Sequence, residues 1–143
     1  MFIYRPYEHS DLNFIQSSWA NSYYQGCDGH KGITPDDFHH YHRPIRDKIL
    51  SSPTIAIIVC CSQESPDQVI GWIAVEPPNI LRESILHYVY VKSIYQEEGI
   101  ARELMKRALP HRPVYYTHLT GKGWKTILDR HLKSDYIYSP HFI

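Results

Sequence analysis

Residues 85–109 constrain the fold most, because they read as a strand, a tight turn and an amphipathic helix in direct succession. Aliphatic and aromatic side chains fill residues 85–91, a composition that favours a strand. Gly99 then marks a turn, and apolar residues recur on one face of the following helix until Pro110 ends it. This succession predicts an α/β fold with the strand and helix at its centre.

A strand that leads into a helix through a glycine turn creates a site for anions. The first backbone N–H groups of the helix have no partner within it, and the helix dipole adds positive potential there. Gly99 and the small Ala101 would allow a ligand to approach the backbone closely. The alternative is an ordinary strand, turn and helix that bind no ligand.

These residues resemble the acetyl-CoA signature of the GNAT-type N-acetyltransferases. In that family a strand valine precedes, at fixed spacing, a Gln or Arg, a Gly, and a Gly or Ala; the corresponding residues here are Val91, Gln96, Gly99 and Ala101. The resemblance implies that acetyl-CoA binds to Val89, Tyr90, Val91, Gln96, Glu97, Glu98, Gly99, Ile100 and Ala101. Glu97 and Glu98 depart from the family pattern, and two carboxylates oppose phosphate binding unless they point away.

The order of the predicted elements also agrees with this family. Strands are expected at 2–7, 54–61, 68–75, 85–91, 114–117 and 136–138, and helices at 12–23, 34–50, 100–109 and 121–133. The resemblance implies one GNAT domain over residues 1–143, with a mixed central sheet flanked by helices and a last strand that is short or missing. A second family signature is not kept, since its Asn, Ala and Tyr places hold Trp124, Ile127 and His131.

Two residues outside the central strand are candidates for acid–base chemistry. His131 stands where the family often has a tyrosine that protonates the departing sulfur. An imidazole can donate a proton as well, and the alternative for His131 is a packed core histidine. Glu83 precedes the central strand and is a candidate base, with a solvated surface charge as the alternative.

His87 is the third candidate, because family bases often lie on this strand. Its reference pKa near neutrality suits the removal of a proton from an amine. Strand alternation places His87 on the same face as Ile85, Val89 and Val91. The alternative is a histidine that packs against a helix.

The second predicted helix resembles the acceptor-binding region of the family. The residues expected to shape the acceptor pocket are Tyr24, Phe38 and Tyr41. His39 and His42 lie one helical turn apart, next to His40, a spacing that suggests a metal site. No carboxylate or cysteine completes a ligand set by spacing, so we expect a solvated or aromatic-packed helix face and no metal.

Composition argues against several classes of partner. The 15 Lys and Arg residues balance the 15 Asp and Glu residues, so charge gives no reason to expect nucleic-acid binding. The longest apolar run, residues 55–61, is too short to span a membrane, and the N-terminus lacks the features of a signal peptide. The 3 cysteines show no metal spacing, which favours a reduced, cytoplasmic protein.

We therefore predict an N-acetyltransferase that uses acetyl-CoA as cosubstrate and acts on a primary amine of a small molecule or peptide. The alternative is a GNAT-fold protein that has lost catalysis and serves as a binding or assembly subunit. The missing second signature, the acidic turn and the short C-terminus favour that alternative. The acceptor stays open, and a homodimer is one arrangement that a short last strand would allow.

Overall fold

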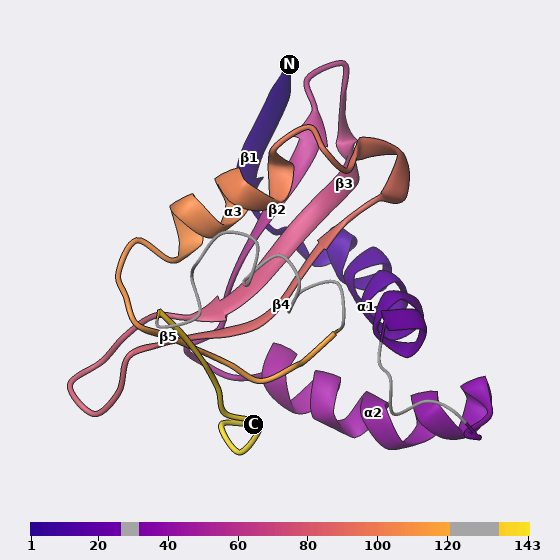
Figure 1. Ribbon diagram of the computed structural model, residues 1–143. Coiled ribbons are helices and arrows are strands. Elements are labelled where there is room, and N and C mark those ends of the chain that lie inside the picture. The colour runs from indigo at the N-terminus through magenta and orange to yellow at the C-terminus, as the bar shows by residue number, and fades with distance from the viewer. Residues whose placement is uncertain (27–31, 121–134) are drawn as a thin grey trace.

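The computed structural model describes residues 1–26, 32–120 and 135–143 (Figure 1). In this part of the chain six strands form one sheet, in the order in which they follow each other along the sequence. The strands are β1 (Phe2–Pro6), β2 (Ala56–Ser62), β3 (Ser65–Glu76), β4 (Ser84–Val91), β5 (Val114–Tyr116) and β6 (Tyr136–Tyr138). The first four pair antiparallel, and β4, β5 and β6 pair parallel. The predicted α/β class with a mixed sheet is confirmed.

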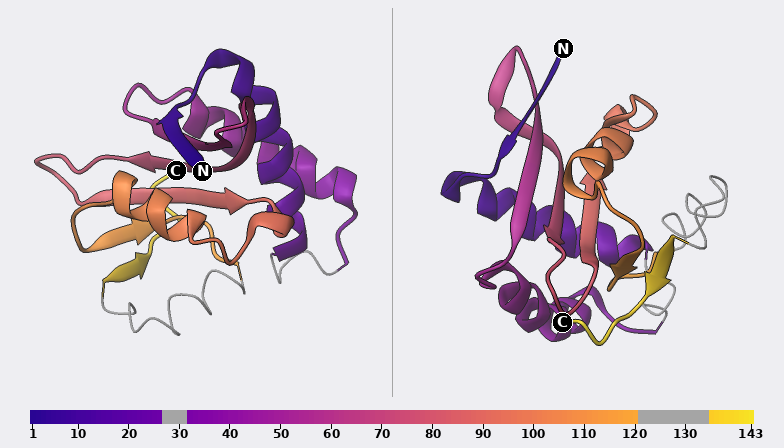
Figure 2. Two further views of the ribbon diagram at one scale, coloured as in Figure 1. Left: turned by 90° about the horizontal axis from the view of Figure 1, so that it is seen from above. Right: turned by 90° about the vertical axis from the view of Figure 1, so that its left-hand side faces the viewer.

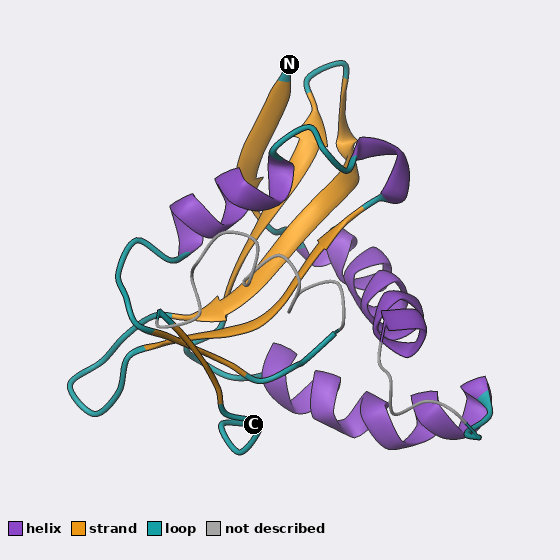
Figure 3. Cartoon of the chain, in the orientation of Figure 1, coloured by secondary structure: helices purple, strands orange, loops and turns teal. Residues whose placement is uncertain are grey.

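In the part of the chain that the structure describes, α-helices α1 (Leu12–Gly26), α2 (Pro35–Leu50) and α3 (Ile100–Ala108) cover the two faces of this sheet (Figures 2 and 3). The chain also forms the short 3-10 turns η1 (His9–Asp11) and η3 (Ser93–Tyr95). Of these described helices, α3 packs on one face, while α1 and α2 share the other. The predicted helix at 121–133 lies outside the described residues. No helix of the described part is long and apolar enough to cross a membrane.

The sequence explains why α2 forms where it does. Thr34 precedes the helix and its hydroxyl accepts a hydrogen bond from the N–H of Asp37 at 3.2 Å. Pro35 occupies the first turn, where its missing N–H costs nothing. The helix continues through Pro44 to Leu50, so Pro44 does not end it.

Each face of the sheet has its own apolar core. On the α3 side, Leu104 and Ile100 pack against Ile73 and Val91. On the other side Trp19 of α1 packs against Trp72 of β3, with ring centroids 5.5 Å apart. Both tryptophans are fully buried. Helix α1 is further fixed to β3 because the indole N–H of Trp72 donates to the hydroxyl of Ser18 at 2.9 Å.

A bulge in β4 changes which side chains share a face. Ala74 of β3 pairs with Tyr88, but the next residue, Val75, pairs with Leu86, so His87 is an extra residue in β4. As a result Leu86 lies in the α3-side core together with Val91. The predicted shared face of Ile85, His87, Val89 and Val91 is therefore wrong, because simple alternation fails at an inserted residue.

Candidate active site

Strands β4 and β5 pair over only three residues of each strand. Ser84–Leu86 pair with Val114–Tyr116, and the last backbone-to-backbone hydrogen bond is donated by the N–H of Thr117 to the C=O of Leu86 at 3.2 Å. Past that point no other described strand pairs with this side of β4. We call the β5-facing side of residues 87–91 the open edge.

Backbone groups of β4 point toward the open edge. The N–H of Lys92 donates to the C=O of Ile70 on β3 at 2.9 Å. Because backbone groups of successive strand residues point to opposite edges, those of Val89 and Val91 point away from β3. The C=O of Val91 already accepts from the side chain of Gln96 at 3.1 Å. The open edge therefore presents the backbone groups of Val89 and the N–H of Val91, to which an extended ligand could bind as an extra strand would.

The open edge leads through the short 3-10 turn η3 to the turn before α3. Glu97 and Gly99 both adopt the left-handed conformation, with φ of 77° and 79°. Gly99 precedes the first residue of α3, and no side chain caps that helix. A Cβ at Gly99 would meet no atom within 4 Å, so the space beside it is open. Glu97 and Glu98 are exposed. The turn thus offers the uncapped N-terminus of a helix to an anion.

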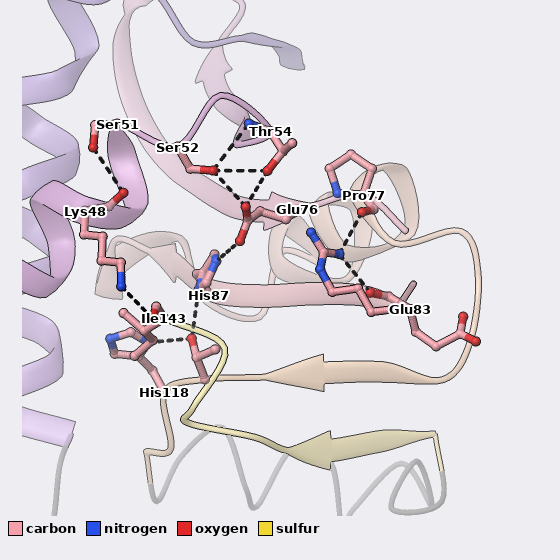
Figure 4. Close-up of polar contacts among 12 residues, drawn as sticks. Lys48, Ser51, Ser52, Thr54, Glu76, Pro77, Glu83, His87, His118 and Ile143 are labelled. Atoms are coloured by element: carbon pink, nitrogen blue, oxygen red, sulfur yellow. Dashed lines mark hydrogen bonds and ion pairs between the residues drawn. The ribbon is translucent and has the colours of Figure 1, made fainter. Parts of the chain in front are cut away.

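A continuous row of hydrogen bonds crosses the fold close to the point where β4 and β5 separate. It joins α2, the segment after β5, the bulge of β4 and the end of β3. We call it the histidine row, and its members in order are Arg46, His42, His118, Thr117, His87 and Glu76. The successive distances are 2.6, 2.8, 2.9, 2.9 and 2.7 Å. Figure 4 shows the half that runs from His118 through His87 to Glu76.

The guanidinium at one end of the row fixes the protons of two histidines. Arg46 can only donate, so Nδ1 of His42 accepts from it. His42 must then carry its proton on Nε2, which it donates to Nε2 of His118. His118 in turn must carry its own proton on Nδ1.

The carboxylate at the other end leads to the same assignment. Ionised Glu76 can only accept, so His87 donates from Nε2 and accepts at Nδ1 from the hydroxyl of Thr117. The oxygen of Thr117 is then the acceptor for the Nδ1–H of His118. Both ends of the row therefore specify one set of tautomers, in which every donor points toward Glu76.

Burial keeps the three histidines neutral. It lowers the pKa of His42 to about 3, with a further lowering by the charge of Arg46. It also lowers the pKa of His118 to about 3, with His42 adding to the effect. For His87, burial lowers the pKa and outweighs the opposing hydrogen bond to Glu76. The ion pair that the His87–Glu76 distance would allow is thus a hydrogen bond from a neutral ring to a carboxylate.

Hydrogen bonds keep Glu76 ionised. Burial alone would raise its pKa, but hydrogen bonds from Thr54, His87 and Ser52 outweigh that effect and the pKa is lowered. Ser52 and Thr54 both donate to Oε1, while Oε2 accepts from His87 (Figure 4). The carboxylate side chain is 13% exposed, so this end of the row reaches the surface.

Aromatic rings enclose the middle of the row. Tyr23 lies with its ring centroid 4.8 Å from that of His42 and 4.8 Å from that of His118. Trp19 contacts the same two histidines, and Tyr88 contacts His118. These rings exclude water from the imidazoles and account for their lowered pKa values.

The predicted acid–base residues differ in their burial and in their surroundings. His87 is 1% exposed and both its ring nitrogens are engaged, so it does not meet the open edge directly. Glu83 is exposed, and its carboxylate points away from His87 (Figure 4). His131 lies outside the described residues.

The residues predicted for the acceptor pocket separate into two groups. The rings of Tyr24 and Phe38 pack 5.1 Å apart, beside the aromatic rings around His42. Tyr41 is 73% exposed and contacts the ring of His40. The described residues contain no group of side chains suited to a metal ion. His42 uses both ring nitrogens within the row, and it is aromatic-packed as expected.

Glu76, Thr117 and His118 were not among the candidates drawn from the sequence. Glu76 ends a strand, and Thr117 and His118 follow one, without any motif around them. Their partners lie 11, 30 and 76 residues away along the chain. No local spacing signals such contacts, so only the fold brings them together.

The comparison with protein families agrees with this geometry. The profile of the acetyltransferase (GNAT) family matches residues 16–112, which is more than half of the chain and includes β4, the turn at Gly99 and α3. This chain belongs to the GNAT acetyltransferase family. The resemblance noted in the sequence is confirmed, and with it the class of acyltransferases. No curated protein sequence matches the chain.

Solved GNAT structures share the fold at low sequence identity. A Pyrococcus furiosus protein assigned as an acetyl transferase superposes with a TM-score of 0.70 at 11% identity, covering 91% of each chain. The PaiA N-acetyltransferase of Thermoplasma acidophilum, solved with coenzyme A, gives 0.66 at 15% identity, covering 91% of this chain and 88% of that one. An aminoglycoside 6'-N-acetyltransferase of Acinetobacter baumannii gives 0.55 at 12% identity, covering 92% and 89%. These identities support the shared fold alone.

Proposed function

We propose that this GNAT protein is an N-acetyltransferase that moves the acetyl group of acetyl-CoA to a primary amine. In this reaction the amine nitrogen bonds to the acetyl carbon, the carbon–sulfur bond breaks, and a proton leaves the nitrogen. The observation that carries the proposal is the continuity of the open edge of β4 with the uncapped N-terminus of α3. One extended ligand with a phosphate-bearing end would match both parts.

The backbone of the open edge would bind the extended arm of acetyl-CoA. The proposed residues are Val89, Tyr90 and Val91, of which Val89 and Val91 direct backbone groups outward. A backbone N–H on this edge would stabilise the negative charge that develops on the thioester oxygen. Such a preformed donor acts in the transition state without side-chain rearrangement.

The turn and the first residues of α3 would bind the phosphates. The proposed residues are Gln96, Glu97, Glu98, Gly99, Ile100 and Ala101. The side chain of Gln96 donates to the C=O of Val91 at 3.1 Å and so holds the turn against the end of β4. Glu97 and Glu98 are exposed, which allows their carboxylates to stay in solvent.

The acceptor would bind on the side of the sheet covered by α1 and α2. Tyr24 and Phe38 stay the proposed acceptor residues, with Tyr41 at the exposed rim. The sequence makes His131 one candidate donor of a proton to the sulfur, and Glu83 a candidate surface base. A peptide or a small molecule with a primary amine would satisfy this chemistry.

A catalytically inactive binding protein is the second candidate, because of the acidic residues in the phosphate turn. One experiment separates the two functions. The protein is incubated with acetyl-CoA and a panel of polyamines, aminoglycosides and peptides, and both free thiol and acetylated product are measured. Enzyme-dependent formation of both, in equal amounts, supports the transferase. Coenzyme A binding without transfer to any amine would favour the binding protein.

A further inference from the structure

We propose that His118 carries the proton from the attacking amine to the departing sulfur, and that Thr117, His87 and Glu76 hold His118 in the tautomer that this needs. This inference rests on the proposed N-acetyltransferase function and adds its acid–base residue. It comes from the single orientation of the histidine row, which its two charged ends dictate independently of each other.

The position of His118 meets the first requirement for such a role. The N–H of Thr117 makes the last backbone-to-backbone hydrogen bond to β4, and His118 is the next residue along the chain. As a residue His118 is partly buried, whereas His42 is 6% exposed and His87 is 1% exposed. Of the three histidines in the row, His118 is therefore the least buried, and it follows the point where β4 and β5 separate.

The state of its ring meets the second requirement. Nδ1 of His118 donates to Thr117, so the lone pair is on Nε2. In the resting protein the N–H of His42 occupies that lone pair at 2.8 Å. An amine that binds there replaces one N–H donor by another, and the row behind Nδ1 stays intact.

The proton then moves without any net change in the row. As the nitrogen–carbon bond forms, the nitrogen gives its proton to Nε2 of His118. As the carbon–sulfur bond breaks, the same proton passes from Nε2 to the sulfur, which leaves as a thiol. Nδ1 keeps its own proton throughout, so the products are an acetylated amine, coenzyme A and the original tautomer of His118.

Thr117, His87 and Glu76 influence this step through the hydrogen bonds on the Nδ1 side of His118. While His118 is an imidazolium, its Nδ1–H donates to Thr117, which donates to His87, which donates to the carboxylate of Glu76. The negative charge at the end of this sequence favours the positive ring, as a buried carboxylate does in hydrolases that use a histidine base. These three are positioning residues, since none of them touches the substrates.

The positive charges near the histidine row favour release of the proton from His118. Arg46 at the far end and Arg82 beside His87 both disfavour a proton that stays on the neighbouring imidazoles. A proton taken up by His118 is therefore passed on and not stored. The carboxylate of Glu76 opposes the effect of the two arginines. Asp47 is a further carboxylate, and its charge acts on Arg46.

Thr117→Val tests the inference because it keeps the shape of the side chain and removes the hydroxyl. We expect turnover to fall about 100-fold or more, the range of general acid–base catalysis, with unchanged affinity for coenzyme A. Thr117→Ser should restore most of the rate. Ser18→Ala, which also removes a buried hydroxyl but lies outside the row, should not change the pH dependence of turnover. If Thr117→Val destabilises the fold, Glu76→Gln keeps the side-chain shape and should also lower turnover.

Nuclear magnetic resonance of the imidazole nitrogens gives a readout that does not depend on activity. We expect His118 to carry its proton on Nδ1, and His42 and His87 to carry theirs on Nε2. A wild-type rate in both Thr117→Val and Glu76→Gln would overturn the inference, as would an Nε2–H tautomer at His118. Absence of acetyl transfer by the wild-type protein would instead contradict the proposed function itself.

Discussion

Nε2 of His42 and Nε2 of His118 lie 2.8 Å apart, although 76 residues separate them along the chain. One comes from α2 and the other from the segment that follows β5. Two buried imidazoles this close cannot both carry a charge at low cost, and Arg46 stands behind His42 at 2.6 Å. A proton on Nε2 of His118 would face the N–H of His42, so the contact joins α2 to the edge of the sheet only while His118 is neutral.

This contact predicts a loss of stability in weak acid. The pKa of both histidines is lowered in the folded protein from 6.5 to about 3, first by burial. Below about pH 6.5 the unfolded chain binds protons that the folded chain does not, so the free energy of unfolding falls as the pH falls. Each histidine contributes a slope of at most about 1.4 kcal/mol per pH unit. Urea unfolding between about pH 7 and about pH 5 measures the slope.

A pair of variants isolates this effect. His118→Gln removes one titrating ring and should flatten the pH dependence, whereas His111→Gln, on an exposed residue, should leave it as in the wild type. Equal slopes in all three proteins would show that the row does not control acid stability.

A second prediction concerns the hydrogen bond between Trp72 and Ser18. Ser18→Ala leaves the buried indole N–H of Trp72 without its acceptor, so we expect a loss of about 1–3 kcal/mol in the free energy of unfolding. Ser17→Ala, at an exposed position of the same helix, should change it by less than about 0.5 kcal/mol. Chemical denaturation of both variants checks this, and equal losses would argue against the contact.

A third prediction tests the phosphate turn. Gly99 and Gly32 both have positive φ and open space around a would-be Cβ, so Gly99→Ala and Gly32→Ala should cost similar backbone strain, about 1 kcal/mol or more. Only Gly99→Ala should weaken coenzyme A binding, because only there would the Cβ occupy the approach of a phosphate. Isothermal titration compares the two variants. Equal affinities in both would place the phosphate site elsewhere.

A fourth prediction concerns His131, which lies outside the described residues. If His131 protonates the sulfur, His131→Phe should keep coenzyme A binding and lower turnover about 10²–10⁴-fold. If His118 alone moves the proton, the same variant should turn over within about threefold of the wild-type rate, well below the general-acid range. Rates and melting curves of His131→Phe and His118→Gln, measured side by side, decide which histidine acts.

The fold was predictable because its signals are local. The composition of residues 85–91, the turn at Gly99 and the apolar face of α3 each lie within a few residues of one another. The error about the faces of β4 arose because a bulge is visible only in the pairing with β3, where Val75 opposes Leu86. A single inserted residue then exchanges the faces of everything before it.

The site was predictable only in the part that depends on a contiguous motif. Val91, Gln96 and Gly99 carry a family spacing, whereas the histidine row draws its members from four separate segments. His87 was identified as a candidate base, but its buried place in the bulge makes it a link between Thr117 and Glu76. Tertiary contacts of this kind leave no periodic trace in the sequence.

Binding of acetyl-CoA is the most direct test of the central claim. A ligand that binds only the folded state stabilises it by about 2.7 kcal/mol at a concentration one hundred times its Kd. We predict that the melting temperature rises with acetyl-CoA concentration, and that Gly99→Ala reduces the rise while Gly32→Ala does not. A melting curve that millimolar acetyl-CoA leaves unchanged would contradict the assignment of the open edge and the turn as an acetyl-CoA site.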